Sequence, residues 1–370
     1  MKTLQAAVLH ADDPDSAQLP LASNSLSSQA KVSLSSSVSE PASLRVRSFG
    51  LPDIPSLIRM PGRLRLDVPD SLLSSQAEFV DFQAALPVLR RERPTYVALA
   101  AGQPVGFVRF SPRGPDGRWV ATSIATSTGV YSPEPVWEGL LEHGVRSAGL
   151  RGVRRLYARV PVGHGLLDAM KRTGWHAYSR ETIFRAERVI AQGRPGRELR
   201  RQEPADAWGI HQLYMAAVPR QIQEIDALTS HVWHHDERRK NRRSIRQSGW
   251  LIEEEGLIRA FARFSRGPRA QMVEAVFAPE DHGQFGAVLD GFVAQRTHGA
   301  PVYCALRSYM LDAGEELTRR GFVEIGEQET LIRYTTASVR APASDPVHFP
   351  VELRPALPRR APTFLEGTQG

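Results

Sequence analysis

The chain of 370 residues contains a single cysteine, Cys304. One thiol excludes an intramolecular disulfide and any zinc site built from several cysteines. The residue lies in the apolar run Val302–Leu306. We therefore expect a buried side chain at Cys304 rather than a catalytic nucleophile.

Long hydrophobic runs are also absent. No apolar stretch approaches the roughly 18–20 residues that cross a bilayer. The first residues after Lys2 are too few and too polar to form the core of a signal peptide. Hydrophobic residues still make up 41% of the chain, which allows a sizeable core. The sequence predicts a cytoplasmic protein without membrane contact, long enough for two domains of roughly 100–200 residues.

Acidic residues are fewer than basic ones, and the net charge is +7. A basic surface attracts anions such as nucleic acids and phosphate-bearing cofactors. Much of the excess lies in two short clusters, Arg197–Arg201 and Arg238–Arg243. Because such clusters are usually solvated, we do not expect a nucleic acid as partner. The oligomeric state cannot be predicted from the sequence.

Both ends of the chain lack the periodicity of regular structure. Residues 1–43 are rich in Ser and predict a disordered segment. Residues 338–370 contain prolines at 342, 346, 350, 355, 358 and 362, which predicts a disordered, extended tail. The Gly/Pro break at Gly193–Gly196 predicts a linker over 191–197, between domains at 44–190 and 198–337.

The two predicted domains resemble one another. Residues 95–110 (TYVALAAGQPVGFVRF) and 249–264 (GWLIEEEGLIRAFARF) each contain a strand, a glycine turn and a second strand that ends in Phe. Each domain also closes on a similar strand, Glu181–Arg185 (ETIFR) and Glu329–Arg333 (ETLIR). Several matches in the same order indicate a duplication.

One order of elements is predicted for both copies. A meander of antiparallel strands is followed by helix, strand, helix and strand, with helices at about 137–148 and 165–172 in the first copy and 284–297 and 310–320 in the second. This order predicts an α+β fold with a mixed sheet and a parallel crossover.

A strand-to-helix junction in the second copy carries a recognisable motif. Phe277-Ala278-Pro279-Glu280 precedes His282–Ala287, which opens a helix. This motif and the element order resemble the GNAT superfamily, the Gcn5-related N-acetyltransferases, over about 45–187 and 198–336. The resemblance implies that backbone N–H groups at the junction bind the pyrophosphate of acetyl-CoA, the cosubstrate. The residues implied to contact it are Val276, Phe277, Ala278, His282, Gly283, Gln284, Phe285, Gly286 and Ala287.

Neither junction matches the family pattern completely. In the second copy His282 replaces Arg or Gln, Phe285 replaces the first Gly, and Ala287 fits the last position. In the first copy Gly139 alone fits. The second copy is therefore the candidate for acetyl-CoA binding and the first is degenerate. The alternative for each junction is a helix start that binds no ligand.

Two residues are candidates for the catalysis that the resemblance implies. Glu274 lies on the strand before the junction, where family members often place a general base. Family members often have a tyrosine on the last helix that acts as general acid, and the two copies have Met170 and Leu317 at this position. Tyr309, near the start of the same helix, is therefore the candidate general acid. An exposed strand Glu and a buried Tyr are the alternatives.

One histidine-rich segment could suggest a metal. His231 and His235 are four residues apart, but the Glu of an HExxH site is missing, so we expect no metal. The resemblance implies instead that this region, with Tyr214 and Trp233, faces the acceptor; the alternative for each aromatic side chain is a place in the core. The sequence thus predicts an N-acetyltransferase acting on a small-molecule or peptide amine. The alternative is a non-catalytic GNAT-like binding or scaffold protein.

Overall fold

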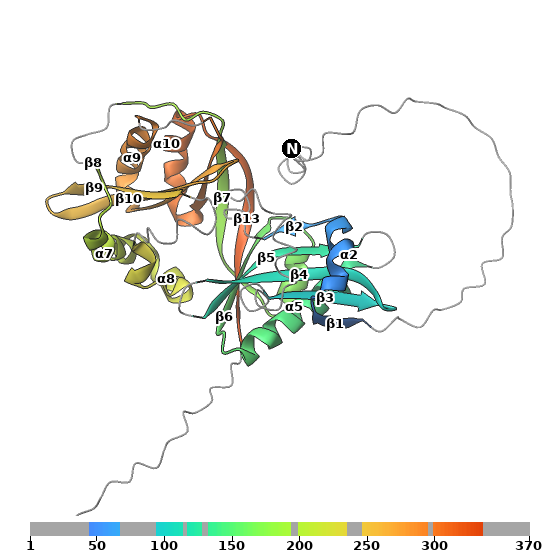
Figure 1. Cartoon of the computed structure of the whole chain (residues 1–370). Coiled ribbons are helices and arrows are strands. Elements are labelled where there is room, and N and C mark those ends of the chain that lie inside the picture. The colour runs from blue at the N-terminus through green and yellow to red at the C-terminus, as the bar shows by residue number, and fades with distance from the viewer. Residues whose placement is uncertain are drawn as a thin grey trace, which may run out of the picture. The chain divides into compact units, whose positions relative to one another are not determined.

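The computed structural model describes residues 44–66, 94–113, 117–127, 132–193, 199–234, 246–294 and 299–335 (Figure 1). The predicted disordered ends 1–43 and 338–370, part of the predicted linker, and the basic segment Arg238–Arg243 lie outside these residues.

The elements follow the predicted order in both halves. The first half contains β1 (Arg45–Ser48), η1 (Leu51–Asp53), α2 (Ile54–Arg59), β2 (Leu64–Arg65), β3 (Thr95–Ala100), β4 (Gln103–Arg113), β5 (Arg118–Thr126), α5 (Pro133–Leu150), β6 (Arg155–Pro161), α6 (Leu166–Arg172) and β7 (His176–Ala186). The second half contains β8 (Leu199–Arg201), η2 (Pro204–Asp206), α7 (Ala207–Ala217), α8 (Arg220–Asp226), η3 (Ser230–Trp233), β9 (Arg246–Glu254), β10 (Leu257–Arg266), β11 (Gln271–Phe277), η5 (Pro279–Asp281), α9 (His282–Ala294), β12 (Val302–Arg307), η6 (Ser308–Ala313), α10 (Gly314–Arg319) and β13 (Val323–Tyr334). The predicted helix 310–320 is correct only in its second part, because residues 308–313 form a 3-10 helix.

The backbone conformation of the two hairpin turns explains why each contains a glycine. Ala101 and Gly102 have φ angles of 49° and 78°, and Glu255 and Gly256 have 52° and 77°. Positive φ at both central residues is the geometry of a tight hairpin turn whose twist suits the flanking strands. Glycine adopts it without the steric cost that a Cβ adds.

Strands of both halves form one mixed sheet, which confirms the predicted fold class. Thirteen strands among the described residues belong to it, in the order β1-β3-β4-β5-β6-β13-β7-β12-β11-β10-β9-β8, with β2 on β5. The pairs β5–β6 and β11–β12 are parallel, and the other pairs are antiparallel.

The last strand of each half lies in the sheet of the other half. β13 pairs with β6 along residues 328–334, and β7 pairs with β12 along residues 181–186. The two exchanged strands also pair with one another (Figure 1). Neither half therefore completes its sheet with its own strands.

A hydrophobic core lies in each half, and each core includes a side chain of the exchanged strand, Leu331 in the first and Phe184 in the second. In the first, side chains of α5 and α6 such as Leu140 and Met170 pack on the strands. In the second, Phe264 and Phe292 stack with ring centroids 4.0 Å apart. Cys304 lies in this second core with 1% of its surface exposed, and burial raises the pKa of its thiol to about 12. The prediction of a buried cysteine is confirmed.

The parallel strand pairs separate before they end. β11 and β12 pair only at residues 271–273 and 302–304, although β11 runs on to Phe277 and β12 to Arg307. β5 and β6 likewise pair only at 118–120 and 155–157. Each half therefore contains a V-shaped gap in its sheet, next to the start of α9 or α5. No helix of the described residues is long and apolar enough to cross a membrane.

Candidate functional site

A cavity of about 400 Å³ lies at the gap between β11 and β12. Glu274, Val276 and Phe277 of β11 and Ala305 of β12 contribute to its wall. Strands of the first half form the opposite side, because β13 and β7 bring them next to β12. The cavity is therefore built by both halves of the chain.

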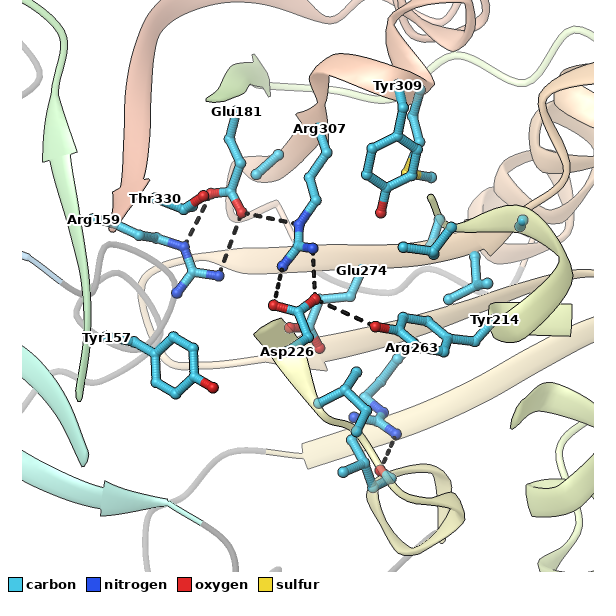
Figure 2. A pocket seen from close by; sticks show the side chains of 18 of the residues that line it. Tyr157, Arg159, Glu181, Tyr214, Asp226, Arg263, Glu274, Arg307, Tyr309 and Thr330 are labelled. Carbon is cyan, nitrogen blue, oxygen red and sulfur yellow. Dashed lines mark hydrogen bonds and ion pairs between the residues drawn. The ribbon is translucent and has the colours of Figure 1, made fainter. Parts of the chain in front are cut away.

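The two candidate catalytic residues lie in this one cavity. Glu274 is an exposed residue of β11, opposite Arg263 of β10 in the strand register. Tyr309 is half-buried in η6, which directly follows β12. The splaying of β11 from β12 thus places a carboxylate on one arm of the gap and a phenol beyond the other (Figure 2).

A chain of alternating charges crosses the cavity (Figure 2). Arg159 of β6 donates to Glu181 of β7, with Nε 3.0 Å from Oε2. Arg307 lies with Nε 3.6 Å from Glu181 Oε1 and donates from Nη1 to Asp226 Oδ2 at 2.6 Å. Only 4% of the Glu181 side chain and 8% of the Asp226 side chain are exposed. Because both carboxylates are buried, loss of a guanidinium partner would leave a buried charge unpaired, which lowers the stability of the fold.

The charges fix the protonation of their neighbours. Burial acts to raise the pKa of Glu181, but the guanidinium groups of Arg159 and Arg307 outweigh it and the pKa is lowered. Burial, followed by the charge of Asp226, raises the pKa of Tyr178, whose hydroxyl donates to Asp226 Oδ1 at 2.9 Å. Burial also raises the pKa of Tyr309. The phenols facing the cavity are therefore neutral hydrogen-bond donors at pH 7.

Two aromatic residues expected to face an acceptor also line the cavity. Tyr214 of α7 and Trp233 of η3 are both largely buried within a small core between α7 and β10. Trp233 Nε1 donates to His211 Nδ1 at 3.3 Å. Both side chains line the cavity, as expected of residues that face an acceptor, and both are also largely buried. Their role in acceptor binding stays a prediction.

The predicted cofactor-binding residues divide into two groups. Val276 and Phe277 line the cavity, whereas Ala278 and His282–Ala287 are not among its lining residues. The predicted loop His282–Ala287 is the first part of α9. Within it, Gln284 donates to Glu254 Oε1 at 2.7 Å and Ala287 packs against the core.

Phe285 and Gly286 face the interior of the second half. Phe285 stacks on Phe277 with ring centroids 4.9 Å apart, and it is buried. A Cβ on Gly286 would lie 2.5 Å from Glu316 Oε2 and 2.8 Å from Arg320 Nη2. The phenylalanine that replaces the family's glycine is thus directed into the core, and Gly286 is needed for packing.

The start of α9 remains open to a ligand at one residue. A Cβ on Gly283 would meet no atom within 4 Å, and the residue is exposed. First-turn N–H groups of a helix lack intrahelical partners and suit a phosphate. Asp281 precedes this turn and adds negative charge, which disfavours one. The helix start therefore combines an open first turn with a nearby carboxylate.

The histidine-rich segment is only partly described. His231 and His234 stack with ring centroids 5.5 Å apart, while His235 lies outside the described residues. Within the described part of the chain, no group of three or more His, Cys, Asp or Glu side chains is arranged to hold a metal ion.

No sequence pattern indicates the charged network. Arg159, Glu181, Asp226 and Arg307 come from β6, β7, α8 and β12. Each is one charged residue among many, and no short spacing connects them. The only local signal is that Arg307 ends an otherwise apolar strand.

Known proteins resemble this chain in structure and not in sequence. No protein-family model matches the sequence, and no curated protein matches it significantly. The structure is similar to a GCN5-related N-acetyltransferase from Sphaerobacter thermophilus, with 12% identity, a TM-score of 0.51, and coverage of 79% of this chain and 95% of that one. A tandem GNAT protein from the clavulanic acid biosynthesis pathway aligns over 79% of this chain and 98% of its own, with 14% identity and a TM-score of 0.47. An aligned share of 79% is more than either half contains, so the chain has the fold of the GCN5-related N-acetyltransferases, present in two tandem copies.

Proposed function

We propose that the protein is an acyl-CoA-dependent N-acyltransferase whose active site is the cavity at the β11–β12 gap. The observation that carries the proposal is this gap. The strands diverge beside the start of α9, and Glu274 and Tyr309 line the cavity at their diverging ends. Diverging strands leave N–H and C=O groups unpaired on their inner edges. An extended molecule with amides of its own, such as the pantetheine arm of acetyl-CoA, satisfies such edges as an added strand would.

Glu274, Tyr309 and the backbone at Ala275–Phe277 each have a role in the proposed transfer. Glu274 accepts the proton that the acceptor's ammonium group loses, which frees the amine lone pair. Backbone N–H groups at Ala275–Phe277 polarise the thioester carbonyl as the C–N bond forms. Tyr309 donates its proton to the sulfur as the C–S bond breaks, and its raised pKa keeps that proton in place at pH 7. Bringing both reactants into one cavity lowers the entropic part of the barrier.

The proposed acceptor is a small molecule or a peptide that carries a primary amine. The cavity wall offers the aromatic ring of Tyr157 and the carboxylate of Glu274, whereas Arg307 lies over the ring of Tyr178 and Arg263 over the ring of Trp233. An aromatic ring and a carboxylate suit an ammonium group. The first half contributes to this wall, so it takes part in acceptor binding even without a cofactor of its own.

Acetyl-CoA binding tests the proposal directly. In a calorimetric titration we expect the protein to bind acetyl-CoA, and Gly283→Asp to weaken binding by about tenfold, equivalent to 1.4 kcal/mol. The added carboxylate repels the pyrophosphate at the helix start, where Gly283 has open space around it.

The control is Gly139→Asp, in the second turn of α5 at the corresponding junction of the first half, where a Cβ would lie 3.0 Å from Leu44 Cδ2. It adds the same charge and, once circular dichroism has shown that the variant is folded, should leave acetyl-CoA binding unchanged. The opposite order of the two variants would move the site to the first half.

A non-catalytic binding or scaffold protein is the second candidate. The acidic residue Asp281 immediately before α9 favours it, since its charge opposes a pyrophosphate. Absence of binding at about 1 mM acetyl-CoA, a limit of about −4 kcal/mol, would reject the enzyme in favour of this candidate.

A further inference from the structure

The V-shaped gap of the first half is occupied by the chain itself. β2 is a strand of two residues, and it pairs antiparallel with β5 at Leu64↔Ile124 and Arg65↔Ser123. These positions on β5 lie beyond its last residue paired with β6, Val120. β2 therefore lies where β5 has already separated from β6.

Leu66 bridges the two arms of that gap. Its N–H donates to the carbonyl of Thr122 on β5 at 2.9 Å, and its carbonyl accepts from the N–H of Arg159 on β6 at 3.1 Å. Thr122 and Arg159 follow the last paired residues of β5 and β6 by two positions each, at Val120 and Tyr157. The backbone of Leu66 thus replaces the direct pairing that the diverging strands have lost.

The inserted segment is also part of the hydrophobic core. Leu64 is 5% exposed and Leu66 is 0% exposed, and both belong to the core that Leu140 of α5 and Leu166 of α6 also help to form. Burial of these two leucine side chains stabilises the segment in this position through the hydrophobic effect. Backbone pairing and side-chain burial therefore both hold the segment in place.

The corresponding gap of the second half is different. Among its described residues, no strand pairs with β11 or β12 between their diverging ends. Residues of the diverging arms, Glu274–Phe277 and Ala305, line the cavity instead. Two copies of one fold thus have one gap filled by a protein segment and one gap without such a segment, although Val120 and Arg159 of the filled gap also line the cavity.

We propose that Leu64–Leu66 is a built-in substitute for acyl-CoA in the first half, so that each chain binds one acyl-CoA and not two. The segment provides what the pantetheine arm would provide in the second half, an extended backbone with amides that pair with both strand edges. The proposal rests on the proposed function for the number of ligands bound. The occupancy of the gap by the segment is independent of it.

Ligand stoichiometry is the first test. Native mass spectrometry of the full chain with acetyl-CoA should show a single bound ligand per chain, and two specifically bound ligands would overturn the inference. If no ligand binds, the proposed function fails, and the filled gap is decided by the following measurement, which needs no ligand.

Hydrogen exchange of the unliganded full chain tests the segment itself. The amides of Leu66 and Arg159 should exchange at least about 100-fold more slowly than in an unstructured peptide, because both donate in the gap. Added acetyl-CoA should increase protection at Glu274–Phe277 and leave fragments containing Leu66 unchanged. Exchange of the Leu66 amide at the unstructured rate, or its release on adding acetyl-CoA, would overturn the proposal.

A pair of variants separates the backbone from the side chain. Leu66→Pro removes the N–H that Thr122 accepts, whereas Leu66→Ala shortens the side chain and keeps the N–H. We expect the Arg159 amide to exchange about tenfold faster in Leu66→Pro than in Leu66→Ala. Equal exchange in two folded variants would overturn the bridging role of Leu66. If Leu66→Pro does not fold, the wild-type exchange measurement decides.

Discussion

Glu181 is the residue at which the two halves meet electrostatically. It accepts hydrogen bonds from Arg159 of its own half, at 3.0 Å, and from Gln328 of the exchanged strand β13, at 2.6 Å. Arg307 of the second half lies 3.6 Å away. A buried carboxylate between two guanidinium groups holds both of them in position. Because Arg307 also pairs with Asp226, the effect of Glu181 reaches the far wall of the cavity.

Removing the charge of Glu181 should destabilise the protein in a pH-dependent way. We expect Glu181→Gln to lower the free energy of unfolding by about 1–3 kcal/mol at pH 7, because Arg159 and Arg307 lose a shared buried carboxylate while Arg307 keeps Asp226. The pKa of Glu181 is lowered in the folded state. Its stabilisation is therefore present above the ordinary pKa of Glu and is lost as the pH falls through the lowered pKa. The difference between wild type and variant should shrink on acidification, as urea titrations at several pH values would show.

The repeat supplies a matched control for this variant. Glu329 begins the equivalent strand motif of the second half, and its nearest basic partners are 3.6 Å or more away. Glu329→Gln should therefore cost less than about 1 kcal/mol. Equal losses for the two variants, or a constant loss at all pH values, would contradict the role assigned to Glu181.

Among individual residues, the sequence predicted correctly the burial of Cys304, which followed from its apolar neighbours. Glu274 and Tyr309 were chosen from a junction motif, and their catalytic roles stay predictions. Asp226 and Arg307 could not be found in this way. They meet because α8 folds over the end of β12, and no local pattern encodes that contact.

Helix α9 has two glycines in its first turns with different surroundings. Gly283 faces open space, whereas Gly286 faces the buried ion pairs of Arg320. Arg320 Nε lies 2.8 Å from Asp290 Oδ1, and its Nη1 lies 2.5 Å from Glu316 Oε2. The helix can lie this close to α10 only where it has no side chain.

The two glycines should therefore respond oppositely to alanine. Gly286→Ala should lower the free energy of unfolding by about 1–3 kcal/mol, since the new methyl group displaces a buried ion pair. Gly283→Ala should be neutral or stabilise by up to about 1 kcal/mol, because alanine favours the helix and meets no neighbour. Thermal unfolding of both variants measures this, and a tolerated Gly286→Ala would refute the close packing.

Elements were predicted well where periodicity was strong. The two hairpins, helix α5 and the strands on either side of α6 all matched, because their patterns are local. β2 was not predicted, since two residues have no period and its position depends on a gap between distant strands. The exchange of β7 and β13 was not predicted either, because the same strand sequence fits either half.

At the scale of the whole chain, the exchanged strands make the halves interdependent. Without β13, β6 and β7 each lose one of their neighbouring strands. Without β7, β12 likewise loses one of its neighbouring strands. Exposed, unpaired strand edges favour aggregation.

We therefore expect that neither residues 1–193 nor residues 194–370 fold when produced alone. Both should become soluble when produced together, since each supplies the strand that the other lacks. The intact chain should unfold in a single transition by circular dichroism and by tryptophan fluorescence. A soluble half with cooperative unfolding of its own would refute this interdependence.

The exchange also dictates the order in which a nascent chain can reach its final structure. A polypeptide leaves the ribosome from its N-terminus, so β6 and β7 emerge long before residues 323–334 that must lie between them. The first half must wait, with an open sheet, until the last strand arrives. Pairing over such a long sequence separation is slow and leaves strand edges exposed meanwhile. Duplication with exchanged ends thus makes the earliest-synthesised half the last to be completed, and its survival during synthesis depends on the half that follows.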